Sequence, residues 1–267
     1  MTFRNDLKVW IRSGSWEFAW GRKADTTRQD PSVYRWKGIP IHYRPGTTDK
    51  GAIYNILVRQ GKKAEYQVPA DIEAEVILDI GGHIGTAAIF LANRFPNARI
   101  YSFEPVPDNF ELLTRNVARL PNVQGFPIAL GLAEAKRDIY ACEDSVNLGG
   151  YSLFVRATDG LMNAGTDASR KVRVNVRPLP DVLSELAVNK IDIIKIDTEG
   201  SEFDILTSMP SVMLSGVQWI MGELHGVRDF ELLAYLSRWF DLKVQKKMDS
   251  DLFLFHARNK ALKRGHE

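Results

Sequence analysis

The sequence predicts an α/β domain with a mostly parallel sheet, helices on both faces of that sheet and an N-terminal extension. From residue 76 onward, short apolar segments alternate with segments whose apolar residues recur at helical spacing. The apolar segments are almost continuously hydrophobic, as parallel strands are when helices cover both faces. We expect the extension to span residues 1–70 and the α/β domain to span residues 71–260.

The N-terminal extension is rich in aromatic residues. The stretch LKVWIRSGSWEFAW, residues 7–20, is typical of a docking helix or strand, because aromatic side chains dominate core and interface packing. We therefore interpret the extension as a docking or substrate-side segment. Further along, GAIYNILVRQG places Ile53, Ile56 and Leu57 at helical spacing, and Gly61 is a helix-stop signal.

The domain itself begins with a predicted strand and continues in regular alternation. The helix after the second strand begins at Pro107, with Asp108 and Glu111 at the spacing of a capping box. Further helices are predicted at 201–209 and 229–239. The predicted buried strands are VILDI (76–80), IYSFE (100–104), IDIIKID (191–197) and VQWIMGE (217–223).

Two later segments complete the predicted organisation. DLKVQKKM and DLFLFHA, at 241–248 and 251–257, are expected to close the sheet as an antiparallel hairpin. Residues 143–171 do not fit the alternation, because they are rich in Gly, Asn, Ser, Thr and Asp. A segment that long is usually functional or disordered, so we interpret it as a loop insertion that is either a substrate-side lid or disordered.

Composition excludes several classes of protein. The single cysteine, Cys142, rules out an internal disulfide framework and a cysteine-based zinc site. No apolar run reaches the length of a membrane span, and the N-terminus lacks the apolar core of a signal peptide. The net charge of +2 does not indicate a nucleic-acid partner. We therefore expect a soluble cytoplasmic protein with no nucleic-acid partner and no membrane span.

Acidic residues stand at the carboxyl ends of the predicted strands. In an open α/β sheet, ligands bind outside these ends. Each acid taken alone could be the N-cap of the following helix, but four matched positions together predict an acid-rimmed pocket. These acids are Asp79, Glu104, Asp197 and Glu223.

The glycine-rich turn LDIGGHIGTAA, residues 78–88, follows the first of these acids. A dinucleotide pyrophosphate needs bare backbone N–H groups at a helix N-terminus, and a carboxylate at Asp79 would repel it. S-adenosylmethionine carries a sulfonium and an ammonium and has no phosphate, so it suits the turn better. Glu104 stands where a ribose-binding acid is found in dinucleotide folds, and Gly81 and Gly85 would allow close backbone approach.

At these residues the chain resembles the FkbM family of class I methyltransferases. The segment 43–49, YRPGTTD, resembles an upstream segment of many members. The resemblance covers roughly residues 43–240, and it implies a Rossmann-like, mostly parallel seven-stranded sheet. The segments that carry it are LDIGGHIG (78–85), FEPVPDNFELLTRN (103–116), PIALG (127–131), DIIKIDTEGSEFDIL (192–206) and GELHG (222–226).

The resemblance also implies an activity and roles for individual residues. Members use S-adenosylmethionine to methylate hydroxyls, commonly on sugars or glycan-containing natural products. The methionine end of the cofactor would lie at Asp79, Gly81 and Gly85, and the ribose at Glu104. Ala129, in a turn after the third strand, would lie against the adenine, and Asp197 and Glu199 would face the transferring methyl group. His83 departs from the family, which usually has Asn there, and this puts one cofactor contact in doubt.

Methylation of a hydroxyl requires a group that takes its proton. His225 is the base that its ordinary pKa favours, and a structural histidine is the alternative. Asp197 and Glu199 could serve as base, orient the acceptor or, with Glu223, bind a divalent cation. We do not favour a metal. Lys195 interrupts an apolar strand, and we expect its ammonium either to snorkel or to pair with a nearby acid such as Glu202 or Glu223, in a structural role.

The sequence therefore predicts an S-adenosylmethionine-dependent O-methyltransferase acting on a hydroxyl of a small molecule, sugar, glycan or natural product. Two alternatives stay open: a nicotinamide-dependent oxidoreductase on a related sheet, and a non-catalytic binding protein that keeps the fold. The identity of the acceptor and the oligomeric state, with a homodimer among the alternatives, are not readable from the residues.

Overall fold

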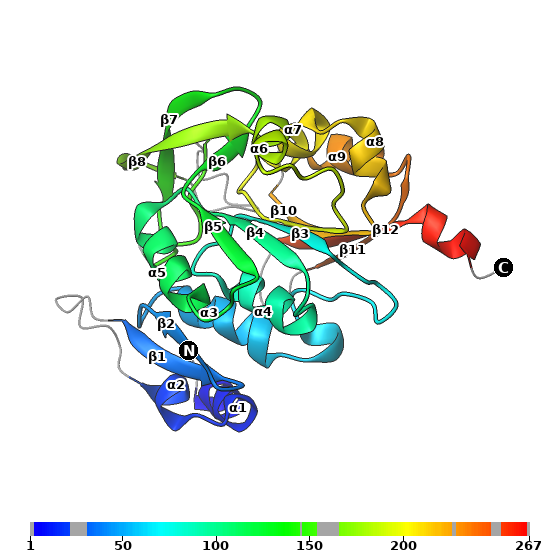
Figure 1. The fold of residues 1–267 in the computed structure, drawn as a ribbon. Helices are drawn as coiled ribbons and strands as arrows, with labels where there is room; N and C mark the ends of the chain where they lie inside the picture. Colours follow the sequence, from blue (N-terminus) through cyan, green and yellow to red (C-terminus); the bar gives the residue numbers. More distant parts are fainter. Residues whose placement is uncertain are drawn as a thin grey trace.

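The central feature of the fold is a seven-stranded sheet in strand order β11-β12-β10-β9-β3-β4-β5 (Figure 1). The computed structural model describes residues 3–21, 31–144, 146–153, 166–225, 228–246 and 252–265. Only β12 runs antiparallel to its neighbours in this sheet, and it lies between β10 and β11. The strands are β3 (Val76–Ile80), β4 (Arg99–Phe103), β5 (Val123–Phe126), β9 (Ile193–Ile196), β10 (Trp219–Leu224), β11 (Phe240–Lys246) and β12 (Phe253–Asn259).

Helices cover both faces of the sheet, which confirms the predicted fold class (Figure 1). Alternate residues of β3 enter two separate cores: Ile77 packs on one face, and Leu78 and Ile80 on the other. One face is covered by α4 (Thr86–Arg94) and α5 (Pro107–Val117). The other is covered by α6 (Leu179–Glu185), α7 (Glu202–Ser208), α8 (Ser211–Gly216) and α9 (Asp229–Leu236).

The N-terminal elements pack into the first of these cores. Phe18, Tyr34 and Ile41 are buried in the same cluster as Ile77 of β3. The extension therefore shares its core with the α/β domain. Its elements are α1 (Phe3–Ser13), α2 (Trp16–Trp20), β1 (Ser32–Trp36), β2 (Ile39–Tyr43), α3 (Asp49–Ile53), a π-helical turn (Tyr54–Val58) and a 3-10 turn (Gly61–Lys63).

A single asparagine joins the N-terminal hairpin β1-β2 to the domain. The side chain of Asn116 on α5 accepts a hydrogen bond from the backbone N–H of His42 at 2.7 Å and donates to the His42 carbonyl at 2.9 Å. It also donates to the carbonyl of Ile84 at 2.8 Å, in the turn before α4. These bonds fix β2 beside the glycine-rich turn.

A second, three-stranded sheet in the order β6-β8-β7 was not expected from the sequence. It comprises β6 (Ala129–Gly131), β7 (Ala135–Cys142) and β8 (Thr166–Pro178). The predicted loop insertion 143–171 is therefore wrong at its C-terminal end, because residues from Thr166 onward pair with β7. Residue 145 and residues 154–165 of that segment lie outside the described part of the chain.

The predicted antiparallel closure by the last two strands is confirmed, with β12 pairing to both β10 and β11. The chain then ends its described part in a 3-10 turn at Lys260–Gly265. Within the described residues, no helix is long and apolar enough to cross a membrane.

Candidate functional site

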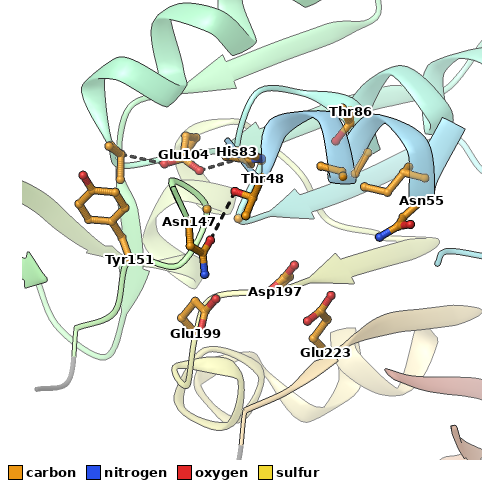
Figure 2. Close-up of a pocket in the computed structure, with 18 of the residues that line it drawn as sticks. Thr48, Asn55, His83, Thr86, Glu104, Asn147, Tyr151, Asp197, Glu199 and Glu223 are labelled. Carbon is orange, nitrogen blue, oxygen red and sulfur yellow. Dashed lines mark hydrogen bonds between the residues drawn. The ribbon is translucent and has the colours of Figure 1, made fainter. Parts of the chain in front are cut away.

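A pocket of about 850 Å³ lies at the carboxyl ends of the central strands (Figure 2). Its walls come from the turn after β3, the end of β4, the start of β6 and the segment after β9. Residues of α2, α3 and the π-helical turn close the side toward the N-terminal extension. The pocket therefore brings together the strand ends that carry the predicted acids and elements of the N-terminal extension.

The glycine-rich turn approaches its neighbours so closely that side chains do not fit. Gly81 has φ +82°, and a Cβ there would overlap the carbonyl oxygen of Asp197. A Cβ on Gly82 would overlap the side chains of Ser102 and Leu113. Only glycine suits such positions, so the backbone of this turn forms the pocket wall directly.

Glu104 points its carboxylate toward this turn. One oxygen accepts a hydrogen bond from the backbone N–H of His83 at 2.7 Å, and the other from the N–H of Val106 at 2.9 Å. Burial raises the pKa of Glu104, although these hydrogen bonds oppose the shift. The carboxylate is thus held at the pocket by backbone groups, with further lone pairs to accept a ligand's hydroxyl.

A ring of polar contacts supports Glu104 from behind. His83 Nε2 lies 3.1 Å from Asp49 Oδ1, and Arg44 donates to Asp49 at 2.8 and 2.9 Å. Arg44 also donates to Asn109 Oδ1 at 2.7 Å, and Asn109 reaches back to Glu104 at 3.5 Å. Asp49 is fully buried, yet His83 and Arg44 outweigh its burial and hold its pKa well below the usual range.

The segment 146–153 lies across this ring. Asn109 donates to the carbonyl of Leu148 at 3.0 Å, and the N–H of Thr48 donates to the carbonyl of Val146 at 3.0 Å. Figure 2 shows Asn147 beside Thr48, with an oxygen–oxygen distance of 3.5 Å. The start of the predicted insertion therefore forms part of the pocket wall, together with Tyr151.

Three carboxylates form the opposite wall. Asp197, Glu199 and Glu223 face the same space in Figure 2 and line the pocket. The hydroxyl of Tyr66 donates to Asp197 Oδ2 at 3.2 Å. Glu199 has φ +57°, a left-handed and strained conformation for a non-glycine residue.

His225 lies behind this wall. Its Nδ1 is 3.0 Å from Glu202 Oε1, and its Nε2 is 3.5 Å from Asp197 and 3.6 Å from Glu199. Burial alone would lower the pKa of His225, but the carboxylates of Glu199, Glu202 and Asp197 raise it well above its ordinary value. These acids therefore favour the protonated form of the imidazole.

This geometry corrects the role predicted for His225. A general base must be unprotonated and within reach of the acceptor, whereas His225 is 1 % exposed and is not among the residues that line the pocket. His225 and Asp197 lie close together, but the Asp197 carboxylate is the group that lines the pocket. His225 supports this wall from behind through its contacts with Asp197, Glu199 and Glu202.

Lys195 and Asp79 form a buried pair between β9 and β3. The Nζ of Lys195 lies 3.4 Å from Asp79 Oδ1 and donates to the carbonyl of Gly81 at 2.6 Å. Asp79 accepts a further hydrogen bond from Ser102 at 2.7 Å. The expected partners of Lys195, Glu202 and Glu223, were wrong, because Asp79 is opposite Lys195 in the β3–β9 register.

The predicted cofactor residues divide into two groups. Gly81, His83, Glu104 and Ala129 line the pocket, as do Asp197 and Glu199. Asp79 and Gly85 do not: Asp79 is fully buried, and Gly85 packs against α5 as the N-cap of α4. Ala129 begins β6 instead of lying in a turn, because residues 129–131 pair with β8.

Sequence reasoning missed several residues of the site. Asp49 and Arg44 belong to the YRPGTTD segment, where a charged pair flanking a Pro-Gly turn was a usable signal. Tyr66, which contacts Asp197, stands in a stretch without any periodic or motif signal. Tyr151, by contrast, belongs to the segment 143–171 that we interpret from the sequence as a substrate-side lid or disordered, and it lines the pocket.

One group in the described part of the chain could hold a metal ion. Asp197, Glu223 and His225 offer ligand atoms that all lie within 4.8 Å of one another. The set differs from the three acids considered from the sequence, since His225 replaces Glu199. A cation there would require His225 to be unprotonated.

Comparison with known proteins identifies the family. Residues 79–253, more than half of the chain, match the family described as the methyltransferase FkbM domain. This chain belongs to the FkbM methyltransferase family. S-adenosylmethionine is therefore the cofactor of the domain, and the buried carboxylate of Glu104 and the bare glycine turn suit its ribose and methionine parts.

Among curated proteins, the FkbM domain of this chain is similar to the hexuronic acid methyltransferase AglP of Haloferax volcanii, with 28% identity over 62% of this chain and 62% of that protein. It is 29% identical to AMB antimetabolite synthetase AmbE of Pseudomonas aeruginosa over 58% of this chain, which is 8% of that protein. The similarity to 31-O-demethyl-FK506 methyltransferase FkbM of Streptomyces tacrolimicus is 23% over 57% of this chain and 66% of that protein.

The aligned part of this chain thus spans less than two thirds of the length of AglP and a small part of AmbE. Among solved structures, the fibrillarin of Aeropyrum pernix, described with natively bound S-adenosyl-L-methionine, matches with a TM-score of 0.45 and 14% identity. That match covers 85% of this chain and 82% of the fibrillarin.

The first prediction concerns the buried pair. Lys195→Met leaves the carboxylate of Asp79 uncompensated in the core, so the free energy of unfolding should fall by about 3–5 kcal/mol in urea denaturation. Adding Asp79→Asn removes the orphaned charge and keeps the hydrogen bond from Ser102, so the double variant should recover much of the loss. Equal stability of the wild type and Lys195→Met would contradict the pairing.

The second prediction concerns pH. The folded pKa of His225 is raised above its unfolded value, so its contribution is complete below about pH 6.5 and is lost as pH rises toward the folded pKa. Urea denaturation with EDTA should show stability falling above neutrality, by at most about 1.4 kcal/mol per pH unit for one proton. His225→Asn should lack this slope.

His256 provides the control for that measurement. Burial, and then Lys243, lowers its pKa to about 4, so its contribution has the opposite sign and is lost as pH falls below about 6.5. His256→Gln should change the acid side of the profile and leave the slope above neutrality intact. The assignment to His225 fails if its replacement leaves the alkaline slope unchanged.

Proposed function

We propose that the protein transfers the methyl group of S-adenosylmethionine to a hydroxyl oxygen on a sugar, glycan or other natural product. The observation that carries this proposal is the single pocket that joins the Glu104 side to the wall of Asp197, Glu199 and Glu223. The names of two relatives, a hexuronic acid methyltransferase and a 31-O-demethyl-FK506 methyltransferase, support this acceptor class.

Cofactor binding would use the side of the pocket at the glycine turn. Glu104 would accept hydrogen bonds from the ribose hydroxyls, and the bare backbone at Gly81 would allow close approach of the methionine part. Ala129, a small residue at the wall, would leave room for the flat adenine. When bound, S-adenosylmethionine supplies a methyl group made electrophilic by its sulfonium.

The acidic wall would act on the acceptor. Asp197 would take the hydroxyl proton when the acceptor oxygen is methylated, and the bound cofactor would supply the methyl group with its sulfur as the leaving atom. Tyr66 and His225 contact different oxygens of Asp197, at 3.2 and 3.5 Å, so that the carboxylate is held in place. Glu199 and Glu223 add negative charge that favours a cationic cofactor over an anionic one.

Each open alternative meets a specific observation. Membership of a methyltransferase family weighs against the nicotinamide-dependent oxidoreductase. A non-catalytic binding protein would need neither the strained backbone at Glu199 nor an aligned carboxylate at Asp197. Turnover of a hydroxyl acceptor separates this last alternative from the proposal.

The third prediction tests the ribose contact. Glu104→Gln should weaken binding of S-adenosylhomocysteine by about 1–3 kcal/mol in calorimetry, because a charge-assisted hydrogen bond is lost and its partner stays desolvated. Glu111→Gln, an exposed glutamate on α5, is the matched control and should bind normally. Unchanged affinity in a folded Glu104→Gln protein would overturn the ribose assignment.

The fourth prediction tests the proton acceptor. A screen by mass spectrometry with S-adenosylmethionine would supply a hydroxyl acceptor for rate measurements. Asp197→Asn should then lower turnover by about 10²–10⁴-fold while S-adenosylhomocysteine affinity stays near normal. Asp181→Asn, on the exposed face of α6, is the matched control.

EDTA separates the metal alternative in the same assay. An enzyme that uses a carboxylate base should keep its activity in the chelator. An enzyme that needs a cation bound by Asp197, Glu223 and His225 should lose its activity and regain it when Mg²⁺ is added. If Asp197→Asn keeps full turnover and EDTA has no effect on activity, the role of Asp197 is refuted and Glu199 becomes the candidate base.

A further inference from the structure

The pocket extends well beyond the residues that would hold the cofactor. Its lining also includes Trp20, Lys50, Asn55 and Glu65, all of which precede the segment that matches the family. The N-terminal elements therefore contribute pocket surface beyond the glycine turn and Glu104, and this surface is available to an acceptor.

Trp20 belongs to a cluster of three tryptophans on α1 and α2, which we call the tryptophan cluster: Trp10, Trp16 and Trp20. The rings of Trp16 and Trp20 lie 4.0 Å apart between centroids, and Trp10 lies 5.9 Å from each of them. Trp10 is 40% exposed and Trp16 is 62% exposed. Exposed apolar patches of this kind usually mark a binding surface.

The cluster is held rigidly. The Nζ of Lys50 donates to the carbonyl of Ala19 at 2.7 Å, which ties α2 to α3. Ser15 caps α2 by accepting from the N–H of Phe18 at 3.1 Å, and Phe18 is buried against Tyr34 with ring centroids 4.3 Å apart. A preformed platform loses little conformational entropy when a ligand binds.

Polar groups surround the aromatic surface at the pocket. Asp6, Lys50, Asn55 and Glu65 line the pocket together with Trp20. A wholly apolar acceptor, such as a lipid chain, would desolvate these groups without giving them hydrogen bonds. A pyranose offers both an apolar C–H face for an aromatic ring and hydroxyls for carboxylate, amide and ammonium partners.

We propose that the tryptophan cluster is a saccharide-binding subsite of the acceptor pocket, where Trp20 supports the methylated sugar and Trp16 and Trp10 support the sugar units beside it. The proposal rests on the proposed function and deepens it, because it assigns an oligosaccharide as the acceptor class. Trp20 lines the pocket and its ring lies against that of the exposed Trp16, and this link favours a ligand of the pocket over a membrane or a second copy of the chain.

The test uses the full chain saturated with S-adenosylhomocysteine. A glycan array identifies a bound oligosaccharide, and calorimetry then compares this oligosaccharide with its monosaccharide. Trp16→Ala should weaken oligosaccharide binding about tenfold and leave the monosaccharide unchanged, because one aromatic contact is lost. Trp20→Ala should weaken both. Phe230→Ala, which removes a ring that is 89% exposed on α9, is the matched control.

Several outcomes would overturn the proposal. The first is the absence of any bound glycan on the array, and the second is an unchanged oligosaccharide affinity in Trp16→Ala. The third is a Trp16→Ala variant that binds glycan normally but no longer sediments with phosphatidylglycerol vesicles or no longer self-associates. S-adenosylhomocysteine affinity should stay within about twofold in all variants. If S-adenosylhomocysteine does not bind even the wild type, the proposed function is refuted. The glycan measurements are then repeated without S-adenosylhomocysteine, and they still test whether the tryptophan cluster binds saccharide.

Discussion

A buried lysine joins the ends of the two central strands, and both walls of the pocket depend on it. Lys195 on β9 pairs with Asp79 on β3 and donates to the carbonyl of Gly81, where β3 turns into the glycine-rich wall. Gly81 also packs against the backbone of Asp197. The contacts around Lys195 therefore position both the glycine-rich turn and Asp197, which lies in the opposite wall of the pocket. An ion pair this deep is costly to desolvate, and removing either partner would leave the other uncompensated. The pair thus helps to set the distance between the glycine-rich turn and the wall of Asp197, Glu199 and Glu223.

Acidic groups outnumber basic groups at the carboxylate wall of the pocket and behind it. In the described part of the chain, five carboxylates lie around two buried basic side chains, Lys195 and His225; the five are those of Asp79, Asp197, Glu199, Glu202 and Glu223. The raised pKa of both basic groups follows from this excess of acid. A ligand that brings a sulfonium supplies positive charge where it is lacking. On the opposite side, Glu104 is supported by backbone N–H groups and by the ring through His83, Asp49, Arg44 and Asn109.

The sequence was most informative where local pattern and fold agree. Apolar strands, their acidic ends and the glycine turn predicted the parallel sheet and the pocket at its edge, because strand ends of one sheet must meet. It failed where tertiary contacts decide. Asp79 looked like a ligand contact, but it lies opposite Lys195 in the β3–β9 register, and its buried carboxylate pairs with Lys195 instead of lining the pocket. His225 looked like a base, but the fold places it behind the pocket wall, beside three carboxylates more than 20 residues away in sequence that raise its pKa, those of Asp197, Glu199 and Glu202. The sheet of β6, β7 and β8 pairs segments separated by a long insertion, which no periodicity reveals.

In the proposed arrangement, one pocket holds S-adenosylmethionine between Glu104 and the carboxylate wall, with the N-terminal extension on the acceptor side. A crystal structure of the protein with S-adenosylhomocysteine would show this arrangement or exclude it. We expect ribose hydroxyls hydrogen-bonded to Glu104, the methionine part against Gly81, and the sulfur directed toward Asp197, Glu199 and Glu223, with open space beside Trp20. A ligand whose ribose lies away from Glu104, or whose sulfur points away from the acidic wall, would contradict it.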